Sequence, residues 1–111
     1  IKKGFIYDNN KNYKDFLSTK QFSKIIEALI KKNSLGIFNV SIGKKILLNQ
    51  LVNWLNYFNK EEYKIKNLPK NFNNQNFYLN NAKLIKETKL KINLTNLKKD
   101  CKRISKMFFK I

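Results

Sequence analysis

Several residue types that commonly build functional sites are rare in this sequence of 111 residues, which has no histidine, one cysteine and one arginine. A zinc or other transition-metal site is not expected, because histidine and cysteine are the usual ligands of these metals. Cys101 is the only cysteine, so the sequence holds no internal disulfide. Because Cys101 lies among apolar residues of a predicted helix, we interpret it as a small buried hydrophobic residue. A free cysteine of this kind fits a reducing, cytoplasmic setting.

Glycine is also scarce, and Gly4, Gly36 and Gly43 are too far apart to form a glycine-rich loop that binds a dinucleotide phosphate. No apolar run approaches the ~20 residues that would span a bilayer, so no membrane association is expected. Hydrophobic residues still make up 42% of the sequence, which is enough for the core of one small domain. The first residue is Ile1 rather than methionine, which leads us to expect a piece of a longer protein.

The formal net charge is +17, and this excess by itself favours nucleic-acid binding. Three features weaken that interpretation. Arg103 is the only arginine, whereas proteins that recognise bases and phosphates specifically favour the bidentate guanidinium group. The lysines are also spread along the whole chain, and Lys, Asn and Ile are all residues with AT-rich codons. No specific nucleic-acid partner is expected, but a small basic binding module for nucleic acid or an acidic partner remains the alternative.

Short extended segments alternate with amphipathic helices along the sequence, which predicts a mixed α/β fold with about four helices and short strands. Residues 3–7 and 13–18 are predicted to form a hairpin around a cluster of turn-forming residues. Residues 36–41 are predicted to form a further strand, and residues 63–66 a strand or an extended connector. The predicted helices run from a Thr19 cap to about Asn33, from about Leu48 to Asn59, from Asn80 or Asn81 to Lys89, and from Leu94 through the final apolar residues.

Apolar residues at helical spacing identify the faces that are expected to be buried. In the last helix, these residues are Leu97, Cys101, Ile104, Met107 and Phe108. Four aromatic residues are also expected in the core, namely Phe5, Phe16, Phe38 and Phe58, with Trp54 as a core or interdomain anchor.

Three further residues are predicted to have structural roles. The carboxylate of Asp15 is expected to accept backbone amides at the start of the first long helix. Asn39 is expected to bond to neighbouring backbone within the strand 36–41, and Gly43 to adopt a positive φ in the turn that follows.

Four stretches resemble, in order and spacing, the C-terminal third of the NAD-dependent epimerase/dehydratase family, the extended short-chain dehydrogenases. These are Tyr13–Leu17, similar to Arg-Asp-Phe-Ile; Gly36–Gly43, similar to Gly-x-Tyr-Asn-Val-Gly-x-Gly; Asn80–Leu84, similar to Asp-x-Ser-Lys; and Asn93–Leu97, similar to the start of the family's last helix. The resemblance covers nearly the whole chain. Departures such as Lys14 for arginine, Ser41 for glycine and Asn80 for aspartate imply a divergent member.

The resemblance implies that residues 1–111 form a single C-terminal substrate-binding domain, without the Rossmann half that binds the cofactor. The full-length parent would be an enzyme, namely an NAD- or NADP-dependent epimerase, dehydratase or reductase of sugar nucleotides. The fragment alone would bind no cofactor and be inactive, because the family's Tyr-x-x-x-Lys pair lies further upstream. Tyr7 and Lys11 share that spacing, but they flank a predicted turn and would not face the same way. The implied partners are a nucleotide-sugar, the missing Rossmann half and, as an option, a second copy in a homodimer.

The same resemblance assigns three candidate substrate-binding residues. Lys14 matches a phosphate-binding arginine and would supply a point charge to the diphosphate. Lys70 and Asn73 match an arginine and an aspartate that reach phosphate and ribose, and Phe77 follows at the position of a nearby aromatic residue. Lys14 and Lys70 could equally be ordinary solvated lysines.

Overall fold

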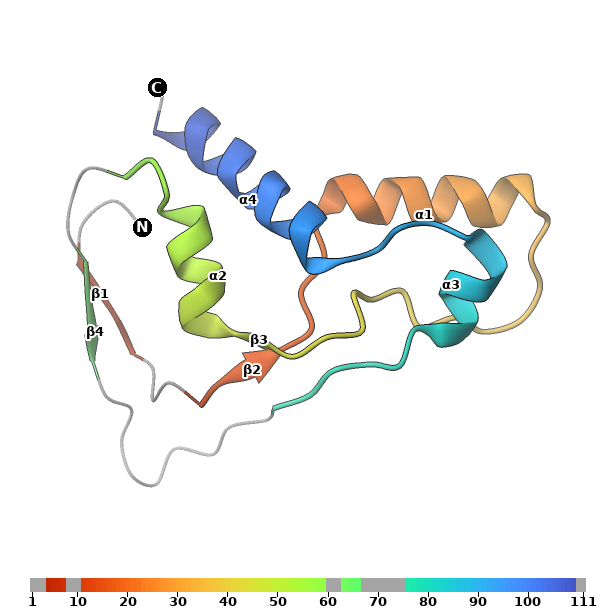
Figure 1. Ribbon diagram of the computed structural model, residues 1–111, viewed down its shortest axis with the longest axis horizontal. Coiled ribbons are helices and arrows are strands. Elements are labelled where there is room, and N and C mark those ends of the chain that lie inside the picture. Colours follow the sequence, from red (N-terminus) through yellow and green to blue (C-terminus); the bar gives the residue numbers. More distant parts are fainter. Residues whose placement is uncertain (1–3, 8–10, 60–62, 67–75, 110–111) are drawn as a thin grey trace.

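Four helices and four short strands make up the computed structural model (Figure 1), which describes residues 4–7, 11–59, 63–66 and 76–109. In chain order the elements are β1 (Gly4–Tyr7), β2 (Tyr13–Lys14), α1 (Thr19–Lys31), β3 (Ile46–Leu47), α2 (Leu48–Leu55), β4 (Tyr63–Lys66), α3 (Ala82–Thr88) and α4 (Leu94–Phe108). None of the helices in these described residues is long and apolar enough to cross a membrane.

Helix α1 begins one residue earlier than the sequence predicts. The hydroxyl of Ser18, not that of Thr19, accepts the amide of Gln21 at 3.1 Å and caps the first turn. The helix ends at Lys31, and Asn33 follows with a φ of 51°, close to the predicted end. Local spacing and capping chemistry are therefore sufficient to place this helix.

The predicted hairpin between residues 3–7 and 13–18 is wrong. Instead, β1 pairs in parallel with β4, and β2 pairs antiparallel with β3, so that Lys14 lies opposite Ile46. Strand propensity marks an extended segment but does not identify its partner, and here both partners come from distant parts of the sequence. Burial of the Ile46 side chain, which is completely covered, favours the pairing of β3 with β2.

Residues 36–41, predicted as a strand, belong to no strand in the described part of the chain. In the described part of the chain, the side chain of Asn39 bonds not to its neighbours but to a distant residue, since its amide donates to the carbonyl of Asn80 at 2.9 Å. Gly43 does adopt a positive φ, of 72°, which confirms the prediction for that position. The segment thus ends in the expected turn but pairs with none of the strands that the structure describes.

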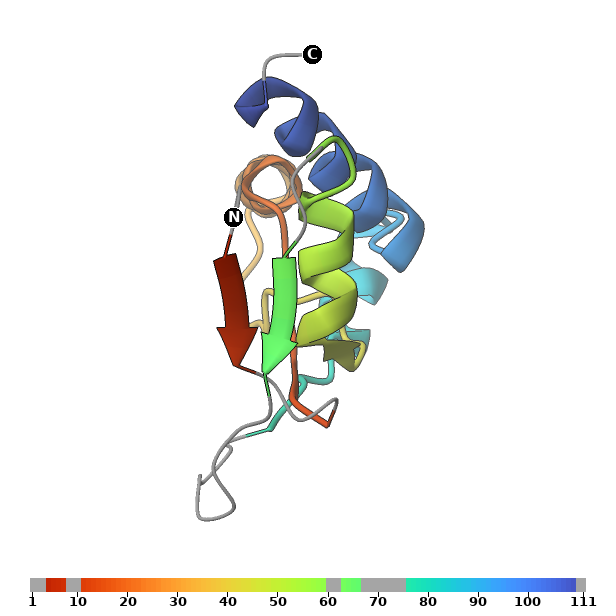
Figure 2. The same ribbon diagram turned by 90° about the vertical axis from the view of Figure 1, so that its left-hand side faces the viewer.

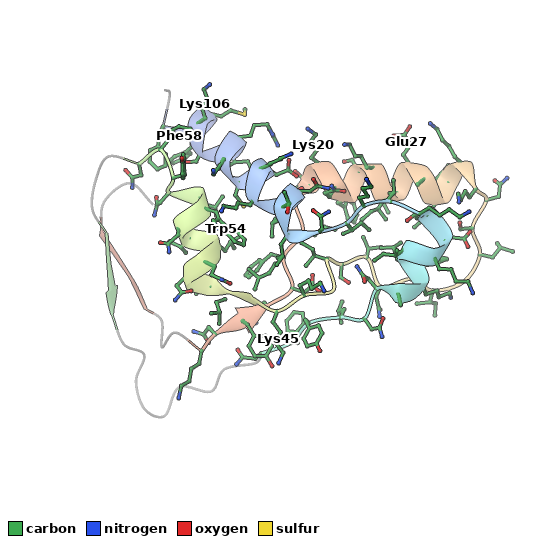
Figure 3. The ribbon with its side chains drawn as sticks, in the orientation of Figure 1. Lys20, Glu27, Lys45, Trp54, Phe58 and Lys106 are labelled. Atoms are coloured by element: carbon green, nitrogen blue, oxygen red, sulfur yellow. The ribbon has the colours of Figure 1, made fainter. Side chains whose placement is uncertain are left out.

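The core gathers apolar side chains from α1, from the segment before β3, and from α3 and α4. Its buried members are Ile25, Ile42, Ile46, Leu84, Ile92, Leu97 and Cys101, with Phe16, Phe38 and Trp54 among the partly buried residues packed against them. Figure 3 shows Trp54 on α2. These three residues match the prediction, whereas Phe58 is half-buried beyond the end of α2, and the side chain of Phe5 lies outside the described part.

Only the first half of the predicted apolar face of α4 is buried. Leu97 and Cys101 lie in the core, but Ile104, Met107 and Phe108 are 40%, 68% and 57% exposed. Ser105 is buried instead, because its hydroxyl accepts the amide of Phe58 at 3.0 Å. Helical spacing therefore identified three apolar residues of α4 whose side chains remain partly exposed.

A buried hydrogen bond joins the start of helix α1 to helix α4. The hydroxyl of Ser18, at the start of α1, donates to the carboxylate of Asp100 in α4 at 2.5 Å. Both side chains are buried, so the carboxylate depends on this partner for compensation. This bond fixes the start of α1 against α4.

The molecule is a thin slab, with principal extents of 46 × 39 × 16 Å measured on Cα atoms. Figure 2 shows the slab edge-on. Axes of packed helices lie about 8–10 Å apart and Cα atoms lie about 2.3 Å from each axis, so this Cα thickness has room for no more than two layers of secondary structure. Its radius of gyration is 16.2 Å, whereas a compact domain of this length has about 13 Å.

Candidate functional site

Asp15 directly follows β2 and is the centre of a polar junction between three segments. One carboxylate oxygen accepts the amide of Ile42 at 2.8 Å, and the other accepts the amides of Gly43 at 2.9 Å and Leu79 at 3.2 Å. The prediction that Asp15 accepts backbone amides is correct, but the amides belong to two distant loops and not to the start of α1. The carboxylate thereby fixes the ends of both loops beside β2.

Asn81 and Gly43 complete this junction. The side-chain amide of Asn81 is buried and donates to the carbonyl of Ser41 at 2.9 Å. Gly43 lies so close that an added Cβ would come within 2.5 Å of the Asn81 side-chain oxygen. The absence of a side chain and the positive φ of Gly43 together allow the two loops to approach each other.

Lys14 ends β2 and is exposed immediately beside the junction. Its ammonium nitrogen lies 5.1 Å from the centre of the Phe77 ring, within the range of a cation–π contact. The segment that carries Phe77 is held against β2 by Asn76, whose side chain accepts the amide of Tyr13 and donates to the carbonyl of Lys11, both at 3.2 Å. Lys14 is therefore a solvent-accessible cation on a fixed backbone, next to an aromatic ring.

A second lysine lies between two other rings. The ammonium nitrogen of Lys45 is 4.9 Å from the centre of the Tyr13 ring and 5.6 Å from that of Tyr78. Figure 3 shows Lys45 near the junction of β2 and β3. Because Lys14 pairs with Ile46 and side chains alternate along a strand, Lys14 and Lys45 belong to opposite faces of this strand pair. Each lysine therefore forms its own cation–aromatic contact.

An open groove adjoins the junction on the side of Tyr78. It has a volume of about 850 Å³ and is lined by Gly43, Tyr78, Asn80, Asn81, Ala82, Ile85 and Lys86. That volume lies within the range of small-molecule sites. The lining offers one ring, one cation and two amide side chains, which suits recognition of a polar ligand better than acid–base chemistry.

The fold of this chain is shared with a solved structure, that of RMD from Pseudomonas aeruginosa complexed with NADPH. The match has a TM-score of 0.70 at 19% sequence identity and covers 95% of this chain but only 34% of RMD. The fold prediction is confirmed. The chain has a mixed α/β fold that it shares with part of RMD, and it spans about a third of the length of RMD. No family model matches the sequence, and no curated protein matches it either.

The three predicted site residues have different outcomes. Lys14 lies beside Phe77, the aromatic residue that the resemblance also singled out, and the role of both stays a prediction. Lys70 and Asn73 lie outside the described residues. The sequence reasoning missed Lys45 and its two tyrosines, although a pair of lysines directly after Gly43 is a visible signal for a cationic loop.

Cys101 offers no nucleophile to such a site. Burial raises the pKa of its thiol above the ordinary value, and the charge of Asp100 acts in the same direction. The thiol therefore stays protonated near neutral pH, which agrees with the interpretation of Cys101 as a small buried hydrophobic residue.

Proposed function

We propose that this chain is the nucleotide-sugar-binding part of an NAD(P)-dependent epimerase, dehydratase or reductase. The observation that carries the proposal is the match of 95% of the chain to about a third of a protein that was solved with NADPH. The order of the four sequence stretches supports it independently. In this proposal the remaining part of the enzyme binds the cofactor and carries the catalytic residues.

Lys14 is the residue proposed to contact the diphosphate of the nucleotide-sugar. It is exposed, and both of its strand neighbours are fixed, since Tyr13 bonds to Asn76 and Asp15 bonds to three amides. A lysine on a fixed backbone segment loses less entropy when it binds a phosphate than a lysine on a mobile loop. Lys70 and Asn73 are proposed to assist, as a phosphate and a ribose contact.

The test uses the complete protein encoded by the gene that contains this sequence, titrated calorimetrically with UDP-, GDP- and dTDP-hexoses. Loss of a charged hydrogen-bond partner costs about 1.5–3 kcal/mol, so Lys14→Ala is expected to weaken binding about tenfold to a hundredfold. Lys14→Arg is expected to retain binding because its fork also suits a phosphate. NADPH binding should be unchanged in both variants.

Lys20→Ala provides the matched control. Figure 3 shows Lys20 on the outer side of α1, and its side chain is exposed. Lys32 would be a poor control, because its ammonium group donates to the carbonyl of Glu87 at 2.6 Å. Equal affinities for the Lys14→Ala and Lys20→Ala proteins would remove Lys14 from the site. Binding of nucleic acid with sequence preference at physiological salt, and of no nucleotide-sugar, would favour the basic-module alternative.

A further inference from the structure

Two tyrosine rings flank one lysine at the place where β2 meets the loop that precedes α3. Tyr78 is 49% exposed, and the ammonium nitrogen of Lys45 lies 5.6 Å from the centre of its ring and 4.9 Å from that of the Tyr13 ring. Tyr78 also lines the open groove of about 850 Å³, which carries the exposed Lys86. A ring has two faces, and Lys45 covers at most one face of Tyr78. The surface therefore offers aromatic rings and cations side by side, next to an open groove.

The charge of this region is almost entirely positive. Residues 11–15, 43–46 and 76–86 contain six lysines and one acidic residue, Asp15. Both carboxylate oxygens of Asp15 already accept backbone amides. The lysines therefore dominate the local electrostatic potential, which favours a ligand with several negative charges.

The backbone that carries the two rings is fixed. The amide of Tyr13 donates to the side chain of Asn76 at 3.2 Å, and the amide of Leu79, the residue after Tyr78, donates to Asp15 at 3.2 Å. Rings on a fixed backbone lose less entropy on binding than rings on a mobile loop. The two tyrosines therefore form a stacking surface that exists before any ligand binds.

Lysines beside exposed rings are typical of surfaces that bind single-stranded nucleic acid. The lysines contact phosphates, and the rings stack on unpaired bases, which all have a π-face, so that the base sequence matters little. The scarcity of arginine argues against sequence-specific recognition but not against this mode, because a phosphate can be bound by a point charge. In a duplex the bases are already paired and stacked on each other, so they are not accessible to the rings.

We infer that Tyr13, Tyr78, Lys45 and Lys86 form a surface that binds single-stranded nucleic acid without sequence preference. The bases would stack on the rings, the phosphates would contact the two ammonium groups, and the groove would hold the strand beside Tyr78. The inference is independent of the proposed function, because it does not use Lys14, which belongs to the opposite face of the β2–β3 pair.

The test measures the fluorescence anisotropy of labelled oligonucleotides of about 20 nucleotides, titrated with the complete gene product. Oligo(dT), oligo(U) and a duplex of the same length are compared at physiological salt. Both single strands are expected to bind, and to bind more tightly than the duplex, because only unpaired bases reach the rings. A surface of lysines alone would favour the duplex, whose phosphates are more densely spaced. Tighter binding of the duplex, or failure of either single strand to bind, would overturn the inference.

A second tyrosine provides a matched control at the end of α2. Tyr57 is 58% exposed, and the ammonium nitrogen of Lys102 lies 4.2 Å from the centre of its ring, so it forms a similar cation–aromatic pair. Tyr78→Ala is expected to weaken single-strand binding at least about fivefold, whereas Tyr57→Ala should leave it unchanged. Tyr78→Phe should bind like the unmodified protein, because the ring is retained. Equal losses for Tyr78→Ala and Tyr57→Ala would overturn the location of the surface.

The salt dependence tests the lysines separately. Each phosphate contact to a single strand contributes about 0.7 to the slope of the logarithm of the affinity against the logarithm of the salt concentration. Lys45→Ala is expected to reduce this slope by about that amount, and Lys102→Ala should not change it. An unchanged slope for Lys45→Ala would show that Lys45 contacts no phosphate and would overturn its place in the surface.

Discussion

Residues 36–40 and residues 41–43 are adjacent in sequence but differ in how their backbone groups are hydrogen-bonded. In the second group, the amides of Ile42 and Gly43 bond to Asp15, and the carbonyl of Ser41 bonds to Asn81. In the first group, no amide donates to another described backbone group. The difference separates a turn that two side chains of this chain hold in place from a segment whose described amides bond to no other described backbone group.

The exposure of the side chains differs between the two groups as well. Ile42 is 2% exposed and belongs to the core, whereas Ile37, five residues earlier, is 87% exposed. Both are β-branched residues, Ile37 within the predicted strand 36–41 and Ile42 directly after it. Local propensity is therefore similar across the stretch, and tertiary contacts alone decide which half is buried.

The largest effect is expected at the polar junction. Asp15→Ala removes the acceptor of three backbone amides, and each partly buried donor left unsatisfied costs about 1–3 kcal/mol. We expect a loss of about 3–5 kcal/mol in the free energy of unfolding, measured on the 111-residue chain by urea denaturation. Asp15→Asn retains one acceptor oxygen and should lose clearly less. A loss below about 1 kcal/mol for Asp15→Ala would mean that the junction does not hold the two loops.

A pair of isoleucines tests the two halves of the stretch directly. Ile42→Ala is expected to reduce the free energy of unfolding by about 2–4 kcal/mol, because it leaves a cavity in the core. Ile37→Ala should change it by no more than about 0.5 kcal/mol in the same isolated chain, since that side chain is already exposed. Similar losses from both variants would show that residues 36–40 are covered within the chain itself.

The smallest effect is expected at the ion pair on α1, where Lys31 and Glu27 are 2.7 Å apart and exposed. The hydrogen bond from Lys31, followed by its charge, lowers the pKa of Glu27 below the ordinary value of 4.5. A lowered pKa stabilises the fold above pH 4.5, and this contribution is lost as the pH falls through the folded-state pKa. Glu27→Gln should leave the melting temperature unchanged at pH 7 and slightly reduce its decline in acid. A large shift at pH 7 in moderate salt would contradict this weak role.

The helices could be predicted from the sequence because their determinants are local. Spacing and caps placed α1 within one residue, and Asn93 caps α4 by accepting the amide of Asn96 at 2.9 Å. Strand pairing could not be predicted, because β1 and β2 each find a partner in a distant part of the sequence. Phe38 was correctly expected to pack against the core, but the β-prone composition of residues 36–41 does not show whether a partner strand is present.

The candidate site likewise combines residues that the sequence could predict with contacts that it could not. Lys14 and Phe77 could be singled out from motifs, yet their contact across 5.1 Å depends on the bonds that Asn76 makes to β2. The link from Asp15 to Leu79 spans 64 residues and leaves no local pattern. Lys45 could not be recognised as a neighbour of Tyr78 without knowing that these two loops meet at Asp15.

The buried bond between Ser18 and Asp100 has a consequence for the order in which the chain acquires its structure. Asp100 follows Ser18 by 82 residues, so the acceptor emerges during synthesis long after α1 has been made. Contacts of such wide sequence separation slow folding, because a long loop must close before they contribute. Until α4 has been synthesised, the first turn of α1 is capped but lacks its bond to Asp100. The core residue Ile25 is then not yet covered by α4. Apolar surface is exposed during this interval, and such exposure favours binding of chaperones to the nascent chain.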